Sequence, residues 1–243
     1  MNRGVLSLTF SHIVDVSTAD PTQLTLLSTS AGFPDVYSLT GGRINGMNSA
    51  DVVIILNPPD LNAIKLNTNL GTNFANSFLS LTGSFISDLS GNAVIPVSFS
   101  NALQVRSFTS DVTRPSLLLF SMNMTSGILS MTFSEPVNVA SLLFSGITLL
   151  SGIPTNHGVP VSNYTLTDGT VVSPNGQIVV VQLSRHDLDV IIALGDLATS
   201  NTTTYLSASE TTIVDMVHNP MESIPLNHPI LVSEYYGLIG KYN

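Results

Sequence analysis

GVLSLTFS at residues 4–11 and GILSMTFS at residues 127–134 are two versions of one phrase. The two stretches are separated by an offset of 123 residues, from Gly4 to Gly127, and six of their eight positions are identical. Apolar and polar residues alternate, as they do in a strand with one buried face. The phrase therefore predicts a β-strand that occurs twice, with Leu6, Leu8 and Phe10 on one face in the first copy.

The repetition continues in order along the whole chain. At the same offset, LTLLS from Leu24 matches ITLLS from Ile147. Four extra residues in SGIPTNHGVPVSN then shift the offset to 127, and insertions of this kind fall in loops. Beyond that loop, the matched stretches are YSLTGG with YTLTDG, DVVIILNPPDLNAI with IVVVQLSRHDLDVI, SFLSL with TYLSA, and ALQVRSF with PILVSEY. The chain is predicted to hold two tandem modules, residues 1–110 and 111–243, joined through a Pro-, Ser- and Thr-containing linker.

Both modules have the residue pattern of a β-sandwich. Short apolar or alternating runs are interrupted by Gly, Pro, Asn and Ser every eight to twelve residues or so, which is the usual rhythm of that architecture. One stretch per module instead predicts a short helix, capped by Asn57 in the first and by Ser184 in the second. The predicted fold class is all-β, with two tandem sandwich modules that each carry one short helix.

Several of these stretches resemble a known family. LSMTFSEPVN, YTLTDG, TTIVDMVHN and FISDLSGN are similar to the Ig-like repeats of large surface proteins. The resemblance extends to SbsA-type and SwmB-type bacterial Ig-like modules and to repeats of giant extracellular proteins in unicellular eukaryotes and sponges. The second copy matches the T-F-S-E-P-V signature fully, whereas His12 and Ile13 replace Glu-Pro in the first. The resemblance implies Ig-like modules, an extracellular or cell-surface location, a structural role and no catalytic residues.

Composition narrows the range of partners. Only 7 residues are basic and the formal net charge is −9, which disfavours nucleic acid because phosphate contacts need Lys and Arg. Hydrophobic residues make up 43% of the chain, so a folded core is expected rather than disorder. No apolar run approaches the roughly 18 residues of a membrane span, and no cofactor is predicted. Cysteine is absent, which excludes disulfides.

Two acidic turns recur at the same place in both modules. Asp88 with Asn92, and Asp215 with Asn219, follow a short apolar stretch. Their side-chain oxygens are of the kind that binds Ca²⁺, but neither spacing supplies the six or more oxygens that the ion needs. Asp also begins turns, and Asn tolerates left-handed backbone geometry. We predict structural turns and no metal site.

The chain contains no catalytic signature that we recognise. The histidines show no H-E-x-x-H spacing, and no G-x-S-x-G or phosphate-binding glycine motif is present. The protein is therefore predicted not to be an enzyme. Three N-glycosylation sequons occur, at Asn123, Asn163 and Asn201, although such tripeptides also arise by chance in chains rich in Ser and Thr.

One strand of the second module has no counterpart in the first. RPSLLLFSMNM at residues 114–124 precedes the second copy of the phrase, whereas Met1 aligns with Met124. In one interpretation the missing strand lies upstream in a longer array. In the other, the tail of one chain completes the first module of the next by strand addition. The candidate assembly residues of that tail are Tyr235, Tyr236, Leu238, Ile239 and Tyr242.

These features together predict a structural repeat protein of an extracellular filament, stalk or matrix. Its expected partners are copies of itself or further Ig-like repeats. The alternative is an adhesin that recognises glycan or protein through end loops 29–50 and 151–163. Those loops and the residue that follows the second hold Phe33, Tyr37, His157 and Tyr164, and the chain has no tryptophan.

Overall fold

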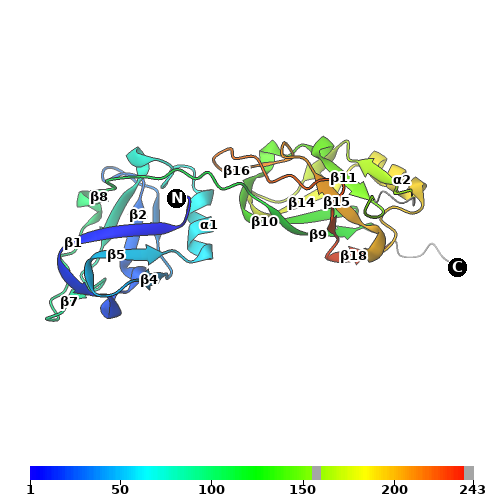
Figure 1. Cartoon of the computed structure of the whole chain (residues 1–243). Coiled ribbons are helices and arrows are strands. Elements are labelled where there is room, and N and C mark those ends of the chain that lie inside the picture. Colours follow the sequence, from blue (N-terminus) through cyan, green and yellow to red (C-terminus); the bar gives the residue numbers. More distant parts are fainter. Residues whose placement is uncertain (155–159, 238–243) are drawn as a thin grey trace. The chain divides into compact units, whose positions relative to one another are not determined.

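The computed structural model describes residues 1–154 and 160–237 and is mostly β (Figure 1). The chain divides into two compact units, Met1–Thr113 and Arg114–Asn243. Among the described residues, neither α-helix combines the length and hydrophobicity needed to cross a membrane.

The first unit contains two four-stranded sheets. One has the strand order β4-β5-β1-β7 and the other β3-β2-β6-β8. Their strands are β1 (Val5–Asp15), β2 (Leu24–Leu27), β3 (Val36–Ser38), β4 (Arg43–Asn45), β5 (Ser49–Ile55), β6 (Phe78–Leu81), β7 (Ser87–Asp88) and β8 (Leu103–Gln104). The helices are α1 (Pro58–Leu66) and the 3₁₀ turns η1 (Val16–Thr18), η2 (Pro21–Gln23), η3 (Phe74–Asn76) and η4 (Phe99–Asn101).

The second unit repeats this plan and adds two strands. One sheet has the order β13-β14-β10-β9-β18, with β16 also on β10, and the other has the order β12-β11-β15-β17. The strands are β9 (Leu117–Asn123), β10 (Ile128–Asn138), β11 (Ile147–Leu150), β12 (Asn163–Thr165), β13 (Gly169–Val171), β14 (Gly176–Leu183), β15 (Tyr205–Ala208), β16 (Val214–Asp215), β17 (Ile230–Leu231) and β18 (Glu234–Tyr236). The helices are α2 (Arg185–Leu194) and the 3₁₀ turns η5 (Val139–Ser141), η6 (Phe144–Gly146) and η7 (Asn201–Thr203).

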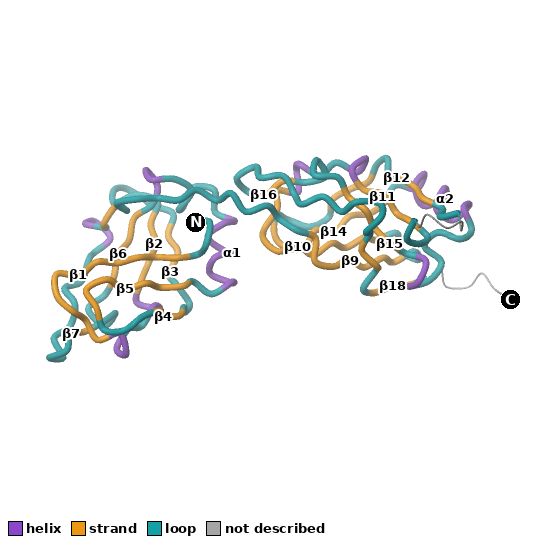
Figure 2. The backbone as a smooth tube through the Cα atoms, in the orientation of Figure 1, coloured by secondary structure: helices purple, strands orange, loops and turns teal. Residues whose placement is uncertain are grey.

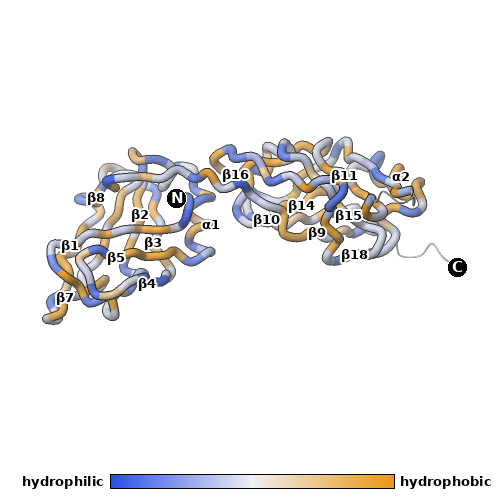
Figure 3. The backbone as a smooth tube through the Cα atoms, viewed as in Figure 1, coloured by the Kyte–Doolittle hydropathy of each residue, from blue (hydrophilic) through white to orange (hydrophobic). Residues whose placement is uncertain are grey.

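The two sheets of each unit share one core. In the first unit, Val52 and Ile54 of one sheet pack in the same cluster as Leu24 and Leu26 of the other. Figure 3 shows how much of the hydrophobic colouring follows the strands in both units. Alternation along each strand places the apolar side chains between the sheets, which is a sandwich-type arrangement.

Each α-helix is anchored by a buried aspartate. In α2 the carboxylate of Asp187 is fully buried and accepts hydrogen bonds from Tyr164 Oη at 2.8 Å, from the amide and hydroxyl of Thr167 at 3.0 and 2.6 Å, and from the Asp168 amide at 3.2 Å. Burial on its own raises the pKa of Asp187, but the hydrogen bonds from Thr167, Tyr164 and Asp168 outweigh it, and the pKa is lowered. This carboxylate therefore stays ionised and ties α2 to the loop after β12.

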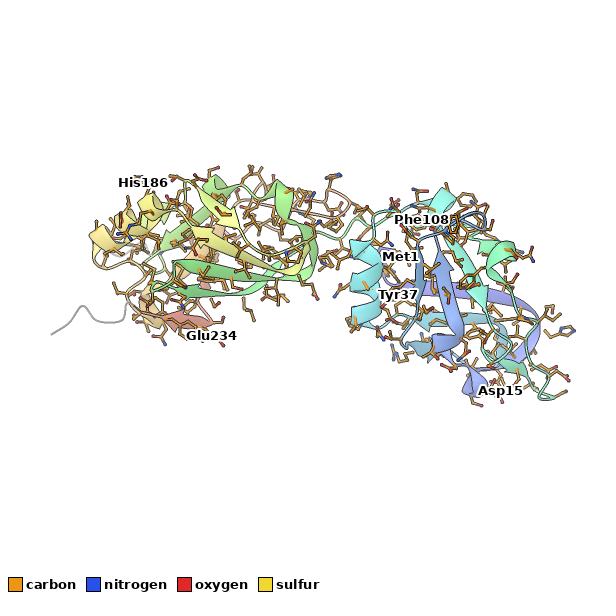
Figure 4. All side chains as sticks on the ribbon, turned by 180° about the vertical axis from the view of Figure 1, so that it is seen from behind. Met1, Asp15, Tyr37, Phe108, His186 and Glu234 are labelled. Carbon is orange, nitrogen blue, oxygen red and sulfur yellow. The ribbon has the colours of Figure 1, made fainter. Side chains whose placement is uncertain are left out.

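The first unit has the same anchor. Asp60 is buried in α1 and accepts from Tyr37 Oη at 2.9 Å and from Thr40 Oγ1 at 2.7 Å. Tyr37 lies beside this helix in Figure 4. Burial and the neighbouring Asp60 carboxylate raise the pKa of Tyr37. The anchor recurs because the repeat preserves the tyrosine, the threonine and the aspartate at matching positions.

Candidate functional site

The two units differ at one sheet edge. In the second unit β10 lies between β14 and β9, and β9 pairs antiparallel with it from Ile128 to Phe133. In the first unit β5 pairs with β1 in the same way, but within the described residues the other edge of β1 pairs only with β7, at Val14 and Asp15. Figure 2 shows the longer sheet of the second unit around β9 and β10. We call the place equivalent to β9 in the first unit the open strand position.

Burial of the repeated phrase reflects this difference. Leu129 and its neighbours Met131 and Phe133 on the inner face of β10 are 0–1% exposed. The matching residues Leu6, Leu8 and Phe10 are only partly buried. The matching positions of the repeated strand are therefore fully covered only where β9 is present.

The missing strand would contribute a substantial part of the core. In β9 and the residue that follows it, Leu117, Phe120, Met122 and Met124 are at most 6% exposed. Burying side chains of this size contributes about 1.5–3 kcal/mol each. Within the described residues of the first unit, Met1 is the counterpart of Met124 and packs against the core, but Leu117, Phe120 and Met122 have no counterpart, so the edge of β1 before Val14 is unpaired and incompletely covered.

The first unit contains the segment that would flank the missing strand on the side away from β1. In the second unit β18 runs parallel to β9, and the Met124 amide donates to Tyr236 O at 2.8 Å. In the first unit the Met1 amino group donates to Thr109 O at the same distance, 2.8 Å. Met1 and Phe108 lie near each other in Figure 4. Residues 107–109 therefore take the place of β18, although no β9 equivalent lies beside them.

The amino group of Met1 is in a partly buried environment. Burial lowers its pKa, the Asp111 carboxylate opposes that effect, and the Lys65 ammonium adds to it. Lys65 and Asp111 themselves form an ion pair at 2.6 Å, with side chains that are 9% and 7% exposed. The ion pair and the Met1 hydrogen bond thus hold the N-terminus, α1 and residues 109–111 together beside the open strand position.

The backbone of β1 has hydrogen-bonding groups directed at the missing strand. Gly4 O accepts from the Leu56 amide at 2.8 Å and so faces β5. Because backbone groups alternate between the two edges of a strand, those of Ser7 and Thr9 face the open edge. The second unit agrees, since the amide of Ser134, the counterpart of Ser11, donates to Ser116 O across that edge at 2.9 Å.

Two predicted tail residues lie within their own unit. Tyr235 and Tyr236 belong to β18, which pairs with β9, and Tyr235 Oη donates to Ala198 O at 2.6 Å. Both tyrosines therefore extend the sheet of their own unit, and the role of the tail in assembly stays a prediction. Leu238, Ile239 and Tyr242 lie outside the described residues.

The two acidic turns are held by their own backbone. Asp88 Oδ1 accepts from the amides of Ser90 at 2.8 Å and Asn92 at 2.9 Å, and Asn92 Nδ2 donates to Asp88 Oδ2 at 2.8 Å. The hydrogen bonds from Asn92 lower the pKa of Asp88. Asp215 accepts from Asn219 in the same manner, at 2.7 Å from both the amide and Nδ2. These carboxylates stabilise the turns in which they lie.

The three sequons occupy different surroundings. Asn163 in β12 and Asn201 in η7 are exposed. Asn123 is partly buried at the end of β9, and its Oδ1 accepts from the Ser126 amide at 3.0 Å. Exposure therefore favours the first two as attachment sites.

The end loops offer fewer ligand contacts than their sequence suggests. Phe33 is fully exposed, but Tyr37 and Tyr164 hold the helix aspartates described above. His157 lies outside the described residues. A separate groove of about 480 Å³ lies on the first unit. It is lined by Gln23, Phe99 and residues of the β3-β2-β6-β8 sheet.

Comparison of the chain with models of protein families and with curated proteins finds no match. The functional argument therefore rests on the geometry of the two units.

Proposed function

We propose that the chain is a structural repeat unit of an extracellular filament, stalk or matrix, built from tandem Ig-like modules that associate through sheet edges. The observation that supports this proposal is the open strand position: β10 is paired with β9, whereas among the described residues the matching edge of β1 is unpaired before Val14 and its apolar residues are only partly covered. An exposed edge of this kind is a ready template for pairing with another chain.

The composition supports a packed assembly. Charged residues make up only 9% of the chain, so the surface depends on Ser, Thr and Asn for its polarity. Fewer charges mean less repulsion between neighbouring units. Exposed Asn163 and Asn201 are in place to carry glycans on the second unit, which suits an extracellular surface.

A pair of variants in the source cells tests this function. Ser7→Pro removes an amide at the open edge, and proline is tolerated on edge strands, so the unit should still fold. Ser7→Ala keeps the amide. With an antibody against loop 29–50, immunogold microscopy should label surface filaments or matrix for the wild type and for Ser7→Ala, but not for Ser7→Pro. Label confined to the cell interior, or equal incorporation of both variants, contradicts the proposal.

A further inference from the structure

We infer that the open strand position binds an extended polypeptide strand with the side-chain pattern of residues 117–124, which runs antiparallel to β1 and is supplied by a repeat-type segment outside residues 1–243. The inference deepens the proposed function, on which it rests for its biological setting. The second unit shows the occupant in place, because β9 is seated on the repeat of the same surface.

The contacts that define this occupant are specific. In the second unit, three carbonyl oxygens in or just before β9 accept hydrogen bonds from backbone amides of three separate segments. The Glu222 amide donates to Pro115 O at 2.9 Å, the Ser134 amide to Ser116 O at 2.9 Å, and the Ser233 amide to Phe120 O at 2.8 Å. The repeat offsets map these donors to Ile95, Ser11 and Arg106 in the first unit. The amides of Ile95 and Arg106 find no acceptor among the described residues, and Ile95 has an 84% exposed side chain.

The side-chain pattern sets the second requirement. Inward positions of the strand carry Leu117, Phe120 and Met122, whereas Leu118 and Leu119 are 57% and 44% exposed. An occupant therefore needs large apolar side chains at the inward positions, spaced as in β9. Ser121 pairs with Ser130 in β10, which places it opposite Ser7 in the first unit.

The described residues contain one strand of this pattern and two positions for it. Moving β9 from the second unit to the first unit of a neighbouring copy would empty one position to fill another. Exchange among identical copies of these residues therefore gains no pairing, so the occupant is a strand that is not already engaged in another position. The tail that follows β18 is the competing source, and the experiment below separates it.

The test uses the full chain at a concentration where sedimentation shows a monomer. The probe is a synthetic peptide of residues 115–124, and calorimetry measures its binding. We expect saturable binding of one peptide per chain, with new hydrogen-exchange protection in β1. A peptide with Phe120→Asp should bind at least tenfold more weakly, and so should one that is N-methylated at Ser121. Because the N-methylated peptide leaves the protein unchanged, its loss of binding cannot come from misfolding.

Protein variants locate the binding edge. Ser7→Ala should keep the affinity and Ser7→Pro should lose it. Absence of saturable binding, binding that survives N-methylation, or protection outside β1 overturns the inference. Tighter binding of a peptide of residues 237–243 overturns the choice of occupant and assigns the position to the tail. If the peptide binds but the protein is absent from surface assemblies, the proposed function alone fails.

Discussion

Phe133→Ala is expected to lower the free energy of unfolding of the second unit by about 3–5 kcal/mol, the usual cost of removing a fully buried phenylalanine. Phe133 is 1% exposed and lies on β10, which pairs with β9. Its repeat counterpart Phe10 is only partly buried and stacks on Phe85 with ring centroids 6.3 Å apart. Phe10→Ala should therefore cost only about 1–2 kcal/mol in the first unit, since less apolar area is lost.

Urea titration followed by backbone amide signals of each unit measures the two values separately. The comparison is matched, because residue type, strand and repeat position are the same. Equal losses would show that Phe10 is as well covered as Phe133, and the open strand position would then lack its predicted energetic consequence. Addition of the peptide of residues 115–124 should raise the cost of Phe10→Ala towards that of Phe133→Ala.

Asp187→Ala is expected to destabilise the second unit by about 3–5 kcal/mol. The substitution removes the fully buried acceptor of the partly buried hydrogen bonds from Tyr164 Oη and from the amides of Thr167 and Asp168. Hydrogen bonds to a charged acceptor contribute about 1.5–3 kcal/mol each, and several are lost together. The same urea titration measures the effect.

Asp189→Ala is the matched control on the same helix. Asp189 is exposed and forms an i,i+4 ion pair with Arg185 at 3.0 Å, which contributes at most about 0.5 kcal/mol. A small change for Asp187→Ala, comparable to that of the control, would refute the role of the buried carboxylate as the anchor of α2. The corresponding aspartate of the first unit, Asp60, should behave like Asp187.

Much of the β architecture follows from local pattern. Strand β1 and its repeat β10 were predictable because alternation of apolar residues is visible in eight residues. The lack of a β9 counterpart within residues 1–113 was also predictable, since Met1 aligns with Met124. The identification of each module as Ig-like remains a prediction.

The role of the helix aspartates was not predictable in the same way. Asp187 near a helix start suits the helix dipole, and that local rule is satisfied whether the side chain is exposed or buried. Its partners Tyr164 and Thr167 lie about twenty residues away in sequence. The sequence signal for this contact is that Tyr, Thr and Asp recur together at matching positions of both copies. The signal is visible only when the three positions are compared jointly.

The tail required the structure for a different reason. Tyr235 and Tyr236 lie at and just after the end of the last aligned stretch, and no local pattern there indicates a strand. Their strand β18 pairs with β9, which is distant in sequence and runs parallel to it. A strand of three residues has too little pattern to predict its partner. Their place in the sheet follows only from the tertiary arrangement.

Hydrogen exchange of single amides in the monomeric chain tests the open strand position most directly. The amides of Ser7 and Thr9 face the open edge, and those of Ser130 and Thr132 face β9. Leu6 and Leu8, which face β5, serve as internal controls. We predict that Ser7 and Thr9 exchange much faster than Ser130 and Thr132 while Leu6 and Leu8 stay protected. Protection of Ser7 and Thr9 equal to that of Ser130 and Thr132 would contradict the account, because their edge would then already be paired.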